Sequence, residues 1–81
     1  MELLDTIELM GSEDYKERFK AEYYQIKIRT EKLEKILEQH KKGTLPFEFT
    51  CEVGMLHTQY IFMLHYKETL EDRAKVENIE I

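Results

Sequence analysis

Aromatic and cationic side chains gather in one stretch near the start of the chain, and they have the clearest chemical potential. The residues are Tyr15, Lys16, Arg18, Tyr23, Tyr24 and Lys27. Tyrosine rings can stack on nucleobases, and lysine and arginine side chains neutralise phosphates. A helix that begins at the start of this stretch would also point free backbone N–H groups toward a phosphate. The pattern therefore indicates a candidate site for a small nucleotide ligand.

Acidic residues interleave with this group, and they support a second interpretation. Glu13, Asp14, Glu17 and Glu22 lie in the same part of the chain. An ordinary mixed-charge helix surface above a tyrosine-lined core would show the same residue types. Both interpretations stay open on the sequence alone.

The other reactive side chains form no pattern that is typical of catalysis or metal binding. Cys51 is the only cysteine, and no base that would activate it as a nucleophile can be named beside it. His40, His57 and His65 lack the i, i+4 spacing that places two imidazoles on one helical face. We therefore expect no enzymatic activity, no metal site and no cofactor, and we expect the histidines to be half-buried at an interface.

Length and charge narrow the class of protein. The chain has 81 residues and a net charge of −5, so we expect one domain, 1–81, without the basic surface that nucleic acids require. An acid follows Met1 where a signal peptide would be basic, and no run of about 18 apolar residues spans a membrane. We expect a cytoplasmic protein. Because a single cysteine excludes an internal disulfide, a chain this short is expected to gain stability by oligomerisation.

The chain contains few helix breakers, with three glycines and one proline, so we predict an all-α fold. The expected elements are a short helix over about 2–10 and long helices over about 13–41 and 50–77, which pack as an antiparallel hairpin. Ser12 and Thr50 are the expected N-caps of the long helices, and Gly43 is the expected end of the first. The tail after Asn78 is expected to fray unless a partner captures it.

Apolar residues recur at alternating steps of four and three along both long helices, which is the spacing of a coiled-coil seam. The first seam contains Phe19, Tyr23, Ile26, Thr30, Leu33, Leu37 and His40. The second seam contains Val53, Leu56, Tyr60, Met63, Lys67, Leu70 and Ala74. We predict that these two faces pack on each other. The short helix is expected to dock through Leu3, Leu4, Ile7 and Met10.

The segment 60–66 is apolar or amphipathic at every position, so one seam cannot bury all of it. Residues beyond the second seam need cover from the short N-terminal helix or from another subunit. Tyr24 and Ile28 lie nearly opposite the first seam and suggest a further contact surface. The sequence therefore predicts a homo-oligomer whose interface includes Tyr24, Ile28, Ile61, Phe62, His65 and Tyr66.

Segments of both long helices resemble a known group of proteins. Residues 15–23, which lead into 31–37, look like the first helix of the small crAss-like-phage-related proteins, which are uncharacterised helical hairpins. Residues 55–66, followed by 70–73, look like their second helix. The connection here contains Pro46 and two phenylalanines, whereas these proteins tend to have a polar helix start. The layout is also remotely similar to phage hairpin sponges that sequester the cyclic-nucleotide signals of CBASS and Thoeris immunity.

These resemblances imply a phage accessory protein in an infected bacterial cell that sequesters a cyclic-nucleotide-type immune signal. No binding residue is transferred from them, because the similarity to the sponges concerns architecture only. One alternative is an acidic, anti-CRISPR-like inhibitor that docks on a host defence protein. Another is a structural or regulatory oligomer whose only partner is itself.

Overall fold

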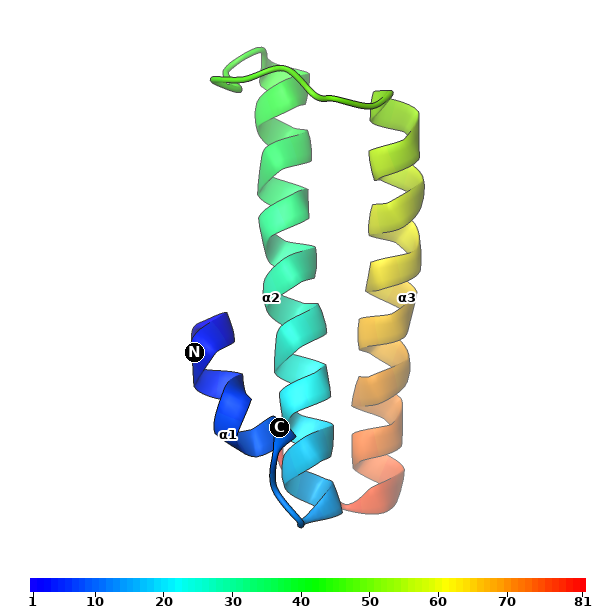
Figure 1. The fold of residues 1–81 in the computed structure, drawn as a ribbon. Helices are drawn as coiled ribbons and strands as arrows, with labels where there is room; N and C mark the ends of the chain where they lie inside the picture. Colours follow the sequence, from blue (N-terminus) through cyan, green and yellow to red (C-terminus); the bar gives the residue numbers. More distant parts are fainter.

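The computed structural model describes all 81 residues, and it confirms an all-α fold without strands. The chain forms a short 3₁₀ helix η1 (Leu3–Thr6), α1 (Ile7–Met10), α2 (Tyr15–Lys42) and α3 (Val53–Glu77). The two long helices lie side by side and run in opposite directions, while α1 lies beside the first half of α2 (Figure 1). The molecule is elongated and measures 43 × 24 × 18 Å. None of its helices combines the length and apolar character that crossing a membrane requires.

Capping residues set the ends of α2. The Asp14 side chain accepts a hydrogen bond from the Lys16 backbone N–H at 2.9 Å, so Asp14, not the predicted Ser12, caps the helix. The Ser12 hydroxyl accepts from the Asp14 N–H at 3.0 Å and stabilises the turn before the helix. At the other end, Gly43 adopts a left-handed conformation with φ of 73°, as a C-terminal glycine should.

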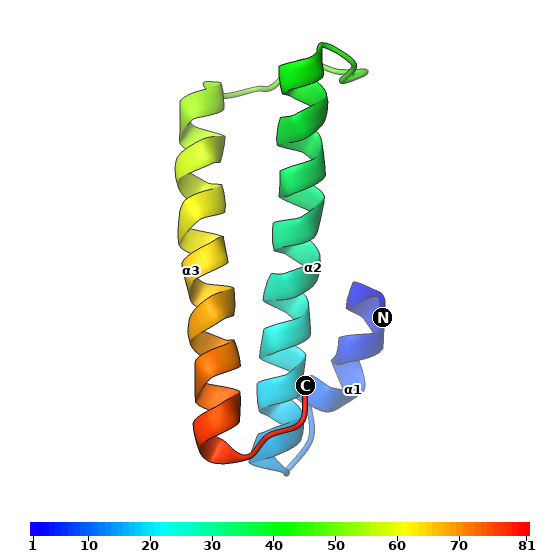
Figure 2. The ribbon, with the colours of Figure 1, turned by 180° about the vertical axis from the view of Figure 1, so that it is seen from behind.

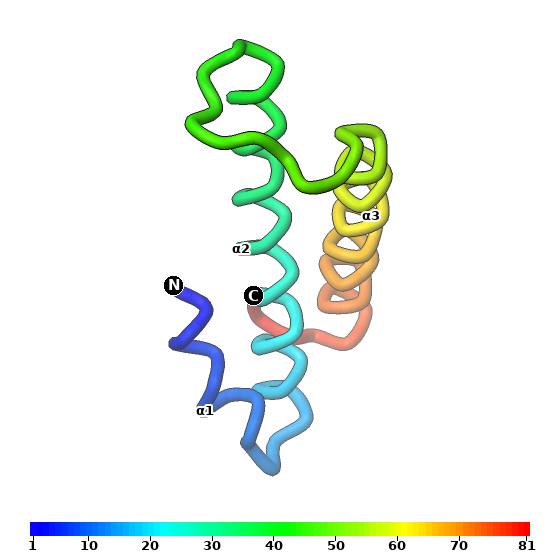
Figure 3. The backbone as a smooth tube through the Cα atoms, turned by 45° about the horizontal axis from the view of Figure 1, so that its top comes forward, coloured from blue at the N-terminus to red at the C-terminus, as the bar shows by residue number.

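The connection between the long helices stays non-helical through Glu52, and it arches from one helix end to the other (Figure 3). Helix α3 therefore begins at Val53, and the predicted cap Thr50 lies too early in the chain to act as one. Leu45 and Phe49 are half-buried beside the helix ends, and the Phe49 ring lies 4.9 Å from that of His40. These contacts close the loop end of the molecule only in part.

The C-terminal tail folds back across the lower part of α2 (Figure 2). Asn78 ends α3 in a left-handed conformation, and the Ile79 N–H donates to the Ala74 carbonyl at 2.8 Å. Ile79 is only 6% exposed. The expectation of a frayed tail is therefore wrong, because the chain's own core captures Ile79.

The core lies at the end where α2 begins and α3 ends. It is a cluster of Phe19, Tyr23, Leu70, Ala74 and Ile79. The predicted seams are confirmed as the facing surfaces, since every seam residue except His40 is buried or half-buried. Toward the connection, Leu37 is the only fully buried apolar side chain. One end of the helix pair is thus well packed, whereas the loop end is loosely covered.

The N-terminal segment docks through a face that differs from the predicted one. Thr6 is buried, and its hydroxyl accepts from the Gln25 side-chain amide at 2.9 Å. Leu3 and Leu9 are half-buried, while Leu4, Ile7 and Met10 are exposed. Since the segment starts as a 3₁₀ helix, residues three apart share its inner face. It packs mainly on α2, and only Leu3 reaches α3, where it lines a shallow groove with Gln59 and Met63. The outward face of α3 is left uncovered, contrary to the expectation that this segment would help to cover it.

Candidate ligand site on α2

The structure separates the six residues that the sequence brings together, and Tyr23 belongs to the core. Tyr23 is 5% exposed, and its hydroxyl donates to the Glu71 carboxylate at 2.7 Å. Burial raises the pKa of Tyr23 well above its ordinary value, and the carboxylate of Glu71 raises it further. Tyr23 therefore links α2 to α3 and presents no ring to a ligand.

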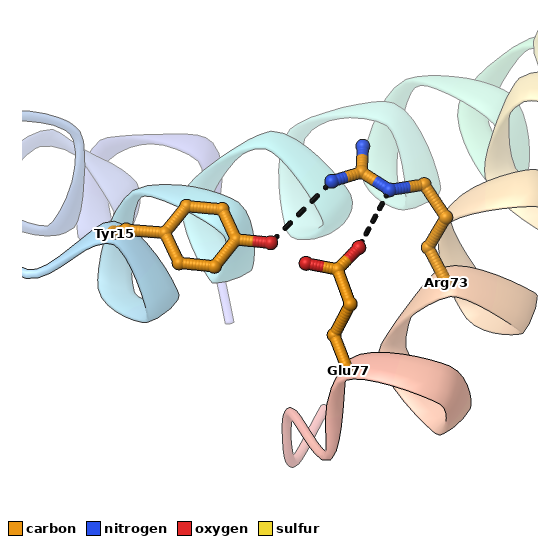
Figure 4. A network of polar contacts seen from close by, with 3 residues as sticks. All are labelled: Tyr15, Arg73 and Glu77. Atoms are coloured by element: carbon orange, nitrogen blue, oxygen red, sulfur yellow. Dashed lines mark hydrogen bonds and ion pairs between the residues drawn. The ribbon is translucent and has the colours of Figure 1, made fainter.

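Tyr15 joins a polar network that also uses two residues of α3 (Figure 4). The Arg73 guanidinium donates to the Tyr15 hydroxyl at 3.4 Å and pairs with Glu77 at 2.8 Å. It also lies 5.0 Å from the centre of the Phe19 ring, within the range of a cation–π contact. This network fastens the start of α2 to the end of α3. Glu77 already compensates the charge of Arg73.

Arg18 also has a partner within the chain. Its guanidinium donates to the Ser12 carbonyl at 2.7 Å, so it holds the turn before α2 in place. Tyr15 and Arg18 consequently take part in fixing the helix end, and neither is an unengaged ligand group.

The other three residues form a continuous stripe with a fourth that sequence reasoning missed. Lys16, Lys20, Tyr24 and Lys27 are spaced four, four and three residues apart, so they share one face of α2. We call this set the lysine–tyrosine stripe. The missed residue is Lys20, and the i, i+4 spacing to Tyr24 was the signal that would have revealed it.

Contacts within the chain hold the stripe in place. The Tyr24 ring packs edge-on against Tyr23, with ring centres 5.2 Å apart, and remains half-exposed. The Lys27 ammonium lies 6.0 Å from the centre of the Tyr24 ring. The Lys16 ammonium lies 3.5 Å from the Asn78 carbonyl oxygen, at the turn into the C-terminal tail. The aromatic ring is therefore positioned by the core, and the lysines of the stripe lie on the same face of the helix.

The stripe has the chemistry to bind an anion that carries an aromatic group. Three ammonium groups extend over about 17 Å of helix, a length that suits a ligand with more than one phosphate. Lysine binds phosphate as a compact point charge, and a half-exposed tyrosine ring can contact a nucleobase. The stripe has acidic neighbours on α2, since Glu17 lies three residues before Lys20 and Glu31 lies four residues after Lys27.

A comparison with protein families gives one match. The family model described as Sequestin matches residues 13–76, which contain α2, α3 except its last residue, and the whole lysine–tyrosine stripe. The chain belongs to the Sequestin family. No curated protein and no solved structure matches it. The name of the family suggests a sequestering function.

The region that matches the Sequestin family also contains a groove at the loop end. The groove is open, has a volume of about 420 Å³ and is lined partly by Glu34, Glu38, His57 and Tyr60. His40 and Lys41 also line the groove, so acidic and basic side chains lie together there. Burial raises the pKa of Tyr60, and the nearby carboxylates raise it further. Cys51 is exposed in the connection.

The residues predicted to form the oligomer interface of this Sequestin chain fall into two groups that differ in exposure. Tyr24 and Ile28 are both half-buried, and the Tyr24 ring also packs against the core. In contrast, Ile61, Phe62 and His65 are exposed on α3.

Tyr66 differs from its neighbours on α3, because it has a partner within the hairpin. Its hydroxyl donates to the Glu22 carboxylate on α2, and this hydrogen bond, together with burial, raises the pKa of Tyr66. The expectation that Tyr66 lacks a partner in the hairpin is therefore wrong. Its ring is still partly exposed beside Phe62.

Proposed function

We propose that this member of the Sequestin family binds and sequesters a cyclic-nucleotide-type immune signal, as a phage accessory protein in the cytoplasm of an infected bacterial cell. The observation that supports the proposal most strongly is the lysine–tyrosine stripe. It combines three ammonium groups with one positioned, half-exposed aromatic ring. Binding alone lowers the concentration of a free signal, so the proposed role requires no catalytic residue.

Two acidic residues near the stripe are engaged in contacts across the helix pair. Glu71 accepts a hydrogen bond from Tyr23, and Glu22 accepts one from Tyr66. Both carboxylates are thereby held by cross-helix contacts and do not pair with the lysines of the stripe. The ammonium groups of Lys20 and Lys27 form no salt bridge within the chain and can meet a phosphate.

We also propose that the protein is a homo-oligomer, with the two long helices as an antiparallel hairpin in each subunit. The single chain exposes 6133 Å², whereas a compact monomer of 9.8 kDa exposes about 5,200 Å². The difference of roughly 900 Å² is close to the area that each partner contributes to a standard interface, about 800 Å². A second copy would bring the exposed surface back to the usual range.

The alternative of an acidic protein–protein inhibitor has less support. It uses Tyr24 and Ile28 as a contact patch, and both residues are half-buried, so each offers only part of its side chain to a partner protein. A purely structural or regulatory oligomer would show neither a ligand nor a host partner, and the binding experiment below separates it from the proposed function.

Isothermal titration calorimetry with a panel of cyclic dinucleotides and cyclic ADP-ribose isomers tests the proposal. We expect one of these ligands to bind the wild-type protein, and Lys20→Gln and Lys27→Gln each to weaken binding about tenfold, as the loss of one charge-assisted contact predicts. Lys35→Gln is the matched control, because Lys35 is exposed on α2 outside the stripe. Absence of binding by every ligand, or equal weakening by the control, would overturn the proposal.

A further inference from the structure

The outward face of α3 is unusual for an exposed helix, because its first half carries no charge. No aspartate, glutamate, lysine or arginine occurs from Val53 to Tyr66. Within this segment, Met55 is 64% exposed and Phe62 is 70% exposed, and Ile61 is also exposed. The solvent-facing side of a surface helix normally carries charged residues. This side of α3 is apolar instead, and its composition is that of a buried protein surface.

No other part of the chain covers this face. The N-terminal segment packs on α2, and the C-terminal tail crosses the lower part of α2 (Figures 1 and 2). The face is therefore open to contact with a second molecule.

The spacing of the exposed residues matches a second helix seam. Met55, Thr58, Phe62, His65 and Thr69 follow each other at alternating steps of three and four, and all of them are exposed. This is the heptad pattern through which two helices pack. Asp72 and Val76 continue the same line, so a charge appears only toward the end of α3.

We propose that two copies of the chain pair through these outward faces of α3, antiparallel, across a two-fold axis that lies between Thr58 and Phe62. The axis then lies at the middle of the uncharged segment, and the interface uses the same surface of both copies. Phe62 lies beside the partner's Thr58, and Met55 lies beside the partner's His65. No charged residue is buried in this arrangement.

Charge distinguishes the antiparallel arrangement from the parallel one. Parallel helices in register would place Asp72 beside the partner's Asp72, and two like charges at a helix interface repel each other. In the antiparallel arrangement, Asp72 lies beyond the start of the partner's α3. The antiparallel arrangement therefore keeps Asp72 out of the contact between the two helices.

Site-specific disulfide cross-linking tests this geometry in the full-length protein, in a Cys51→Ser background that removes the native thiol. Protein with Thr58→Cys is mixed with protein with Phe62→Cys under mild oxidation, without nucleotide. We expect a covalent heterodimer as the main product of the mixture. Val76→Cys is the control, because antiparallel pairing separates its two copies by about 48 Å along the helices. It should therefore remain uncross-linked.

The inference rests on the proposed homo-oligomer, but it does not depend on the ligand. Efficient self-cross-linking of Val76→Cys would show parallel pairing and overturn the antiparallel geometry. Sedimentation velocity on the unmodified protein provides the second readout, because a cysteine variant can fail to fold. A dimer or an even-numbered oligomer supports the two-fold interface, and a monomer overturns it. Loss of ligand binding in calorimetry, in contrast, concerns only the stripe on α2.

Discussion

Helices α2 and α3 have similar lengths, 28 and 25 residues, but their outward faces differ completely. The solvent-exposed side of α2 carries charges of both signs, including Glu31, Lys32 and Lys35. In the first half of α3, the exposed residues include Met55 and Phe62. Helix α2 is thus an ordinary amphipathic surface helix, whereas the first half of α3 has the composition of a helix that is buried on all sides. The comparison assigns different roles to the two helices. We infer that α2 carries the ligand site and α3 carries the assembly interface.

The largest expected effect is that of a charge on the outward face of α3. We predict that Phe62→Glu yields a dissociated and largely unfolded chain, because it places a carboxylate at the centre of the proposed interface, where no group can pair with it. Sedimentation velocity reports the dissociation, and circular dichroism reports the loss of helix.

Lys35→Glu on the outward face of α2 is the matched control for this charge change. Because Lys35 is solvent-exposed, its substitution should change the free energy of unfolding by less than about 0.5 kcal/mol. A stable, fully helical monomer with Phe62→Glu would show that the two outward faces do not differ in function.

A smaller effect is expected on the inner face of α3. Leu70 is buried in the core, so Leu70→Ala should lower the free energy of unfolding by about 2–5 kcal/mol, through lost apolar contacts and the cavity left behind. Val76→Ala on the same helix should have almost no effect, since Val76 is exposed. Chemical denaturation measures both. Equal losses in the two variants would contradict the placement of the core.

The cross-helix hydrogen bond of Tyr23 predicts a dependence of stability on alkaline pH. The pKa of Tyr23 is raised above 10.0, so the unfolded chain releases this proton first, and the native state loses stability as the pH rises above about 10. Tyr23→Phe should cost about 1 kcal/mol at neutral pH, because one hydrogen bond is lost.

Thermal melts across this pH range test the assignment. The melting temperature of the wild type should fall more steeply above pH 10 than that of Tyr23→Phe, since the other tyrosines titrate in both proteins. Parallel curves would show that Tyr23 is not the group responsible.

The smallest expected effect is at Gly54, in the first turn of α3. A Cβ atom added there meets nothing within 4 Å, so the structure gives no packing reason for glycine within the chain. Gly54→Ala should therefore raise the free energy of unfolding by about 0.4–1 kcal/mol, because alanine restricts the unfolded chain more than glycine does. Differential scanning calorimetry measures the gain. A loss of stability would indicate a close approach between copies at this position.

The sequence predicts the large features of the fold well, because a helix that buries one face has apolar residues at regular spacing along that face. The steps of four and three from Phe19 to Leu37 and from Val53 to Ala74 identify the two faces that pack together. The uncharged segment 53–66 likewise identifies α3 as the helix that lacks cover. These features extend over several turns, so no single contact decides them.

Details that depend on a few contacts were harder to predict. The 3₁₀ start at Leu3–Thr6 turns the N-terminal segment so that Thr6 faces α2. The cap of α2 is Asp14, although Ser12 is the same type of capping residue. The short tail carries little periodic information, although Ile79 completes the core.

The candidate ligand site was predictable only in part, for a related reason. Composition identified a tyrosine- and lysine-rich stretch, but only the structure shows which of its residues already have partners. Tyr23 is engaged by Glu71, Tyr15 by Arg73 and Arg18 by Ser12. The remaining face contains Lys20, which the sequence reasoning did not include.

Native mass spectrometry of the protein purified from infected cells tests the central claim most directly, because it reports the number of subunits and any retained ligand in one spectrum. We predict an assembly with an even number of copies that carries additional mass, and that this mass corresponds to a nucleotide after release. A monomer without any additional mass would contradict both the assembly through α3 and the sequestering site on α2.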